Sequence, residues 1–143
     1  MLDELDELRQ AVESGDYRQA LALIDEMDEM SRDDKINKVM SYMRVLLVHL
    51  IKQTAEKRSA RSWENSIDEA LFSIVTSNKR RKSGGYYLND DELMEALAEI
   101  YPRALTWAAR EAFAGMYTAD HLASMVDRDE LLASALQQIK HVQ

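Results

Sequence analysis

The sequence predicts an all-α fold, a compact and mostly antiparallel bundle of five to seven helices around a long central helix. Apolar side chains recur three and four positions apart between residues 33 and 56, which is the spacing of one helix face. Val, Ile and Thr never alternate with polar residues as a half-buried strand requires. The 143 residues include four glycines and one proline, so few positions interrupt a helix.

The length is that of one ordinary domain, so we expect residues 1–143 to form a single helical domain. The chain has no cysteine, which excludes disulfides and thiolate metal sites and fits a reducing compartment. No apolar run approaches the roughly 20 residues of a membrane span, and the acidic opening MLDELDEL has the wrong charge for a signal peptide. We therefore expect a cytoplasmic protein that does not enter a membrane.

The net charge of -8 conceals three blocks of different sign. Residues 1–34 carry twelve acids and three arginines, a net charge of -9. Residues 35–82 carry eleven Lys and Arg against four acids, a net charge of +7, and the remainder carries ten acids and four bases, a net charge of -6. A basic middle block is compatible with nucleic-acid binding. Opposite blocks that face each other across a bundle are the more common cause of such a pattern.

A short first helix is expected where leucines and a valine follow helical spacing. Gly15 should end it, because glycine readily adopts the left-handed conformation that closes a helix. Asp16 is the expected cap of a second helix, and residues 31–34 are expected to separate that helix from the central one. The apolar positions of these two helices are Leu2, Leu5, Leu8, Val12, Tyr17, Leu21, Ile24 and Met27, with Leu23 as a further candidate for the second helix.

Four acids, at residues 25, 26, 28 and 29, crowd the last turn of the expected second helix. The negative end of the helix dipole disfavours them there. Cations from another helix, a basic partner or a metal ion would each balance them, but acids at this density most often form a solvated face. We therefore expect no metal site and no cofactor.

The central helix, residues 33–56, becomes apolar on nearly all sides from Val45 to Ile51, and such a helix needs packing partners on all sides. A basic turn follows it. Ser62 is the expected cap of the next helix, which should pack along the central one and end near Asn78. The expected inner face of that helix is Trp63, Ile67, Leu71, Ile74 and Val75.

The paired glycines of the SGGYYLN stretch predict a flexible loop before the next helix. Asn89 and Glu92 form a capping-box pattern that opens this helix, and Pro102 should kink or break it. Gly115 is expected to end it. A short helix at residues 118–126 and a final helix with an apolar stripe complete the expected bundle.

Two motifs at the end of the central helix resemble the bacterial domain-of-unknown-function family twenty-nine, small helical proteins largely from cyanobacteria. In that family an apolar helix ends in a Leu-Leu-x-His-Leu-Leu-Lys run, and an Arg-Ser-x-Ser-Trp turn follows a basic linker. Here the run is residues 46–52 with His49 in its centre, and the turn is residues 58–63, RSARSW. The resemblance covers about residues 8–112 and leaves 116–143 as divergent helices. It implies a helical fold and no established activity.

Arg44 and His49 are the first candidates for chemistry. Their five-residue separation on one helix resembles the signature of the higher-eukaryote-and-prokaryote nucleotide-binding superfamily, many members of which are RNA-cleaving toxins. Histidine would act as general acid or base near neutral pH, and arginine would stabilise charge on a phosphate. Val45 departs from the signature, which places a polar residue after the arginine. In the competing interpretation His49 is a part-buried side chain that bonds a polar neighbour.

The basic turn is a second candidate, as a binding surface formed by Lys57, Arg58 and Arg61 with Trp63 beside them. Cations next to aromatic rings can hold phosphates and stack bases. A similar mixture follows at residues 79–87, where four cations precede two tyrosines. In the competing interpretation Trp63 anchors the core and the basic runs are solvated helix ends. Nucleophile pairs, phosphate-binding loops and metal-ligand spacings are absent from the sequence.

The sequence therefore favours a non-enzymatic cytoplasmic module that binds or regulates another protein, or that self-associates. One form of this function, suggested by size and charge, is the acidic partner of a toxin-neutralising pair. The alternative is an RNA-binding or RNA-cleaving domain that uses Arg44 and His49 with the basic turn, residues 57–61. A groove shared by these residues would favour the alternative, whereas enclosure of His49 among leucines would favour the interaction module.

Overall fold

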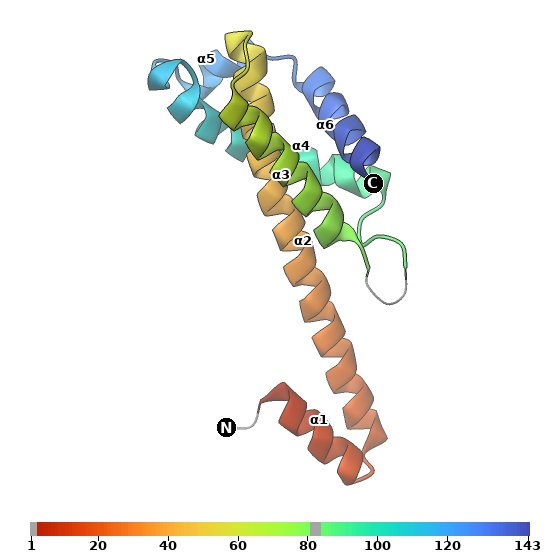
Figure 1. Cartoon of the computed structure of the whole chain (residues 1–143). Helices are drawn as coiled ribbons and strands as arrows, with labels where there is room; N and C mark the ends of the chain where they lie inside the picture. Colours follow the sequence, from red (N-terminus) through yellow and green to blue (C-terminus); the bar gives the residue numbers. More distant parts are fainter. Residues whose placement is uncertain (1–2, 81–83) are drawn as a thin grey trace. The chain divides into compact units, whose positions relative to one another are not determined.

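The computed structural model describes residues 3–80 and 84–143 (Figure 1). Its elements are α1 (Glu4–Glu13), α2 (Tyr17–Glu56), α3 (Arg61–Asn78), α4 (Asp90–Glu111), the 3-10 helix η1 (Ala112–Gly115), α5 (Ala119–Ala123) and α6 (Arg128–Val142). The predicted all-α fold is confirmed. Within the described ranges, β pairing is limited to one antiparallel bridge between Lys79 and Tyr86.

The chain divides into two units, Met1–Lys35 and Ile36–Gln143, and each has a buried cluster of its own. The cluster of the first unit is small and consists of Ala11, Ala20 and Leu23. The cluster of the second unit draws on α2, α3, α4, α5 and α6 and contains most of the buried apolar side chains. No helix in the described part of the chain is both long enough and apolar enough to cross a membrane.

Helix α2 joins the expected second helix and the expected central helix in one element of 40 residues. The break predicted at residues 31–34 is therefore wrong. Ser, Arg and Asp keep their backbone N–H and their rotational freedom, so each weakens a helix by only a few tenths of a kcal/mol and does not end it. The acids at residues 25–29 consequently lie inside α2 rather than in a last turn, and the helix dipole does not oppose them.

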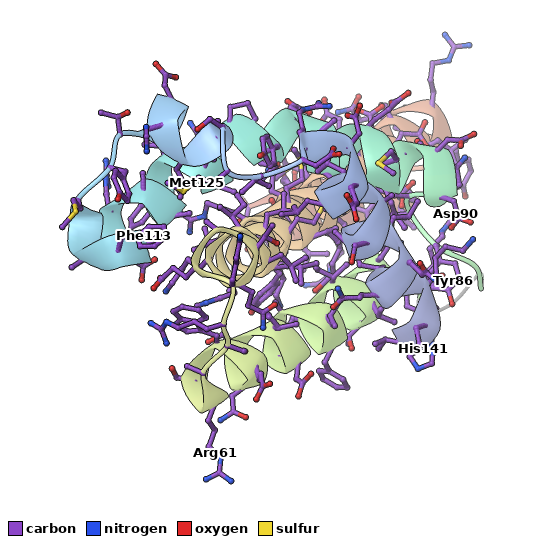
Figure 2. The ribbon with its side chains drawn as sticks, turned by 90° about the horizontal axis from the view of Figure 1, so that it is seen from above. Arg61, Tyr86, Asp90, Phe113, Met125 and His141 are labelled. Atoms are coloured by element: carbon purple, nitrogen blue, oxygen red, sulfur yellow. The ribbon has the colours of Figure 1, made fainter. Side chains whose placement is uncertain are left out.

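In the second unit, the C-terminal half of α2 occupies the centre. Seen from above it is viewed nearly end-on, with α3 and α4 on either side of it (Figure 2). Met43, Leu46, Leu47 and Ile51 have no exposed surface, as expected for a helix segment that is apolar on nearly all sides. The prediction of a long central helix is confirmed.

The start of α4 shows the predicted capping box. The Asn89 side chain accepts from the Glu92 N–H at 2.9 Å, and the Glu92 carboxylate accepts from the Asn89 N–H at 3.1 Å. Pro102 lies inside α4, which continues to Glu111, so of the kink or break predicted at Tyr101 the break does not occur. The apolar packing of the turns on either side, with Leu97 and Ala104 fully buried, holds the helix despite the missing hydrogen bond.

The predicted cap of α3 is also wrong. Helix α3 begins at Arg61, and the preceding Ala60 takes the extended backbone of a cap without a side-chain hydrogen bond. Ser62 therefore lies inside the first turn. Trp63 is consequently in the first turn of α3, where its ring is buried.

The loop between α3 and α4 is held at its base by Asn78, whose side chain is fully buried. Its amide Nδ2 donates to the carbonyl of Leu88 at 3.0 Å, and its Oδ1 accepts from the Leu88 N–H at 2.8 Å. The Tyr87 N–H adds a bond of 2.8 Å to the carbonyl of Asn78. Asn78 thus joins the end of α3 to the residues before α4.

Candidate functional site

Arg44 and His49 line one pocket between α2 and α4, which we call the α2–α4 pocket. Its volume is about 140 Å³. Arg44 and His49 are five positions apart on α2, about 140° around the helix, and the pocket lies over the sector between them, which Val45 and Val48 also line. The pocket is lined by Arg44, Val45, Val48, His49, Trp107 and Glu111.

His49 is half-buried in this pocket. Burial lowers the pKa of its imidazole from the usual value, and the nearby Lys52 lowers this pKa further, while Glu111 acts in the opposite direction. The ring is therefore neutral at pH 7. Its Nδ1 is buried, and no hydrogen-bond partner for this nitrogen is found among the described residues. The polar neighbour that the ordinary interpretation expected is thus not found at Nδ1.

The mouth of the pocket is rich in cations. The guanidinium of Arg44 lies 4.9 Å from the ring centroid of Trp107, and that of Arg110 lies at the same distance. The Trp107 side chain remains 44% exposed, so these contacts hold the ring without enclosing it. Attraction between the guanidinium groups and the π face fixes the ring at the edge of the pocket.

Lys52 connects the pocket to the neighbouring basic turn. It is buried, and its Nζ lies 3.7 Å from the Glu111 carboxylate and 4.6 Å from the ring centroid of Trp63. A buried ammonium group needs such partners to offset its lost hydration. Glu111 is half-exposed at the pocket edge, so its carboxylate pairs with Lys52 and also lines the pocket.

The cations of the basic turn lie on the other side of Lys52. Arg58 covers the ring of Trp63 at 4.5 Å and donates from Nε to Glu56 at 3.2 Å. Lys57 is exposed, and Arg61 projects from the start of α3 into solvent (Figure 2). The ring of Trp63 is buried and presents no face to a nucleic-acid base. None of these residues lines the α2–α4 pocket, whose walls come from α2 and α4.

The second basic run, at residues 79–87, is described only in part. Lys79 and Arg80 are exposed, and the Arg80 guanidinium lies 5.9 Å from the ring centroid of Tyr87. Arg81 and Lys82 lie outside the described residues. The described part of this run contributes a single cation–aromatic contact.

The first unit offers a surface of a different kind. Tyr17, Leu21 and Ile24 share one face of α2 by helical spacing, and all three are exposed. Asp25 and Asp28 continue this face along the helix, one turn after Leu21 and Ile24. The acids of this unit are not gathered as metal ligands: in residues 3–80 and 84–143, no three His, Asp or Glu side chains are placed to hold a metal ion. We call Tyr17, Leu21, Ile24, Asp25 and Asp28 the acidic stripe.

Three residues of the site were missed at the sequence level, namely Lys52, Trp107 and Glu111. Trp107 carried a usable signal, because it falls outside the apolar positions of α4, such as Ala104 and Ala108, that face the core. Arg110 lies three positions further on the same helix face, so the sequence places a cation beside this ring. Lys52 and Glu111 carried no such signal, since their pairing depends on how α2 and α4 pack.

The fold and the pocket define a small all-helical domain with a cation-rich pocket between two of its helices. The chain matches the family described as Domain of unknown function DUF29 over residues 6–125, so it belongs to this family. The resemblance seen in the sequence is thereby confirmed, and no activity is established for the family. No curated protein and no solved structure matches the chain.

Proposed function

We propose that this protein is a non-enzymatic interaction module whose acidic stripe binds a basic amphipathic helix of another protein. The observation that carries the proposal is the exposure of the apolar residues of the stripe. Tyr17 is 67% exposed, Leu21 62% and Ile24 48%, although helix α2 has buried positions beside them at Ala20 and Leu23. Anchors at i, i+4 and i+7 are the pattern by which one amphipathic helix holds another.

Charge supports a basic partner. Residues 1–34 contain twelve acids and three arginines, a net charge of -9. The ion pairs of the described residues are Lys52–Glu111, Arg58–Glu56, Arg128–Asp129 and Lys140–Asp90, and none uses an acid of this segment. Asp3 and Asp16 cap helices, and the other carboxylates of this segment have no cation beside them among the described residues and can face cations of a partner. A second copy of the chain would bring an equally acidic stripe, and like charges would repel.

The toxin-neutralising role considered from the sequence is a special case of this proposal. A basic toxin would supply the cationic helix, and the acidic stripe would cover it. Because the chain has no cysteine, the reducing cytoplasm is the compartment we propose for this interaction.

Photo-crosslinking tests the proposal. Benzoylphenylalanine replaces Leu21 in one full-length variant and Phe72 in a matched control, since Phe72 is also apolar and 66% exposed but lies on α3. After irradiation in the host cell and nuclease treatment, we expect the Leu21 probe to capture a protein through a Lys- and Arg-rich helical segment, and the Phe72 probe not to capture it. A crosslink between two copies of this chain, or the same products from both positions, would overturn the proposal.

A pair of substitutions tests the same surface by affinity. Leu21→Asp should weaken binding of the captured segment at least about tenfold, because it removes an apolar anchor. It also places a strongly hydrated carboxylate where apolar contact is needed. Phe72→Asp is the control and should leave binding unchanged. Circular dichroism of both variants checks that the helices persist, since both residues are exposed.

RNA cleavage at the α2–α4 pocket is a second candidate function. It is favoured by one observation, the presence of Arg44 and His49 on the same pocket wall with a neutral imidazole that can accept a proton. Incubation of single-stranded RNA with the folded protein tests it. Cleavage that is lost in His49→Ala would support this function, and RNA left intact by the wild type would end it.

A further inference from the structure

We infer that the α2–α4 pocket binds a small anion built on a single planar six-membered ring. The volume of the pocket, about 140 Å³, is close to the roughly 150 Å³ of an engineered protein cavity that accepts benzene. It is well below the 300 Å³ or more of typical sites for larger ligands. The methyl groups of Val45 and Val48 and the ring of Trp107 supply the apolar walls that a flat ring needs.

The charges around the pocket select an anion. Arg44 lines the pocket, and Arg110 contacts the same Trp107 ring, while Lys52 lies next to Glu111. The lining itself holds one cation, Arg44, and one carboxylate, Glu111, and that carboxylate is already paired with Lys52. Arg44 is the side chain that would pair with the ligand, because a guanidinium matches the two oxygens of a carboxylate or phosphate.

His49 supplies the polar contact inside the pocket. Its Nδ1 is enclosed by the protein, so the other ring nitrogen, Nε2, is the one that a ligand in the pocket would reach. A hydroxyl or carbonyl group on the ligand ring would pair with it, since a neutral imidazole has one donor and one acceptor nitrogen. The lowered pKa of His49 agrees with this role, because a neutral ring offers both kinds of nitrogen at pH 7.

Two kinds of ligand share this chemistry, a hydroxylated aromatic carboxylate and a pyrimidine mononucleotide. A wider hollow of about 740 Å³ shares one lining residue, Arg44, with the pocket. Arg103 and Glu99 of α4 also line the hollow. A sugar phosphate would lie in the hollow with its ring in the pocket, whereas a benzoate would occupy the pocket alone.

The test is an NMR titration of the full-length protein with three probes, 4-hydroxybenzoate, uridine 5′-monophosphate and neutral 4-hydroxybenzamide. The chain has two tryptophans, Trp107 at the pocket and the buried Trp63, so the second indole is an internal control. A Trp107→Phe variant assigns the two indole N–H signals. We expect an anionic probe to shift the Trp107 signal at millimolar or lower concentration and to leave the Trp63 signal nearly unchanged.

Variants make the result specific to the pocket. Arg44→Gln should weaken the anionic probe about tenfold, because a charge-assisted hydrogen bond is lost, and Arg61→Gln, with the same change of charge at an exposed site, should not. Binding of 4-hydroxybenzoate or of the nucleotide identifies the source of the ligand. The inference is wrong if neither anion shifts Trp107, if 4-hydroxybenzamide binds equally well, or if Arg44→Gln and Arg61→Gln have equal effects.

Discussion

Asn78 makes the most consequential side-chain hydrogen bonds in the described part of the second unit. Substitution by Ala would leave the N–H and the carbonyl of Leu88 buried without their partner. We expect Asn78→Ala to lower the free energy of unfolding by about 2–4 kcal/mol, since each unsatisfied buried group costs about 1–3 kcal/mol. Urea denaturation measures this. Asn65→Ala on the exposed face of the same helix is the control and should change stability by less than about 0.5 kcal/mol.

His49 should make stability depend on pH. Its pKa is lowered in the folded protein, whereas in the unfolded chain it returns to about 6.5. As the pH falls below that value the unfolded state binds more protons, so the wild type loses stability down to the folded-state pKa. The groups that face the ring are Arg44, Lys52 and Glu111, and only the carboxylate favours its charged form.

The measurement is the free energy of unfolding at pH 7.5 and pH 5 for the wild type and His49→Gln. The free energy of unfolding of the wild type minus that of the variant should be smaller at pH 5 than at pH 7.5, because the variant lacks the proton-binding group. Equal differences at both pH values would show that the His49 pKa is the same in the folded and unfolded states.

Residue roles could be predicted from the sequence where they depend on neighbours in the chain. The caps at Asp16 and Asn89 are of this kind, since a side-chain oxygen reaches an N–H three residues on. Asn78 and Trp107 could not be assigned in this way. The partner of Asn78 lies ten residues away across a loop, and the pocket around Trp107 exists only once α4 packs against α2.

Helix α2 shows the same limit at the scale of an element. Its helical character was evident from apolar spacing, but its continuity through residues 31–34 was not. Residues that commonly cap helices do not end one unless the backbone leaves the helical conformation, and the sequence does not state where that happens. The end of α2 is clearer in the structure, because Lys57 has a φ of 55°, in the left-handed region.

Lys57→Gly should therefore stabilise the protein. The left-handed conformation costs a non-glycine residue about 1–2 kcal/mol, and glycine avoids this cost. Glycine also makes the unfolded chain more flexible, which reduces the net stabilisation. We expect a net increase of about 0.5–1 kcal/mol in the free energy of unfolding, read from urea denaturation. Lys57→Ala removes the same charge but keeps the Cβ, so it should bring no increase. If alanine stabilises as much as glycine, the lysine charge rather than the backbone is responsible.

At the scale of the whole molecule, the three charge blocks of the sequence differ in whether they form ion pairs with one another. Lys52 of the basic block pairs with Glu111 of the C-terminal block, as opposite blocks that face each other were expected to do. The N-terminal acidic block has no such pair among the described residues. Composition revealed the blocks, but which of them neutralise each other depends on tertiary packing and could not be predicted from the sequence.

The unequal cores of the two units lead to a prediction of local stability. The buried cluster of the first unit consists of Ala11, Ala20 and Leu23. Its burial offsets only a small part of the backbone entropy cost, about 1–2 kcal/mol for each ordered residue, whereas the second unit has an extensive core. Helix α2 offers an internal comparison, because its residues 20–30 belong to the first unit and its residues 43–52 to the second. Native-state hydrogen exchange should show protection at least about 100-fold weaker in residues 20–30.

The same measurement connects stability with the proposed function. When a basic amphipathic helix binds the acidic stripe, protection of residues 20–30 should rise, because ligand binding to the folded form stabilises it by mass action. Protection of residues 43–52, which lie in the other unit, should stay nearly constant and serves as the control. Equal protection of the two segments in the free protein would show that α2 opens as one cooperative helix. In that case the acidic stripe would be as rigid before binding as after it.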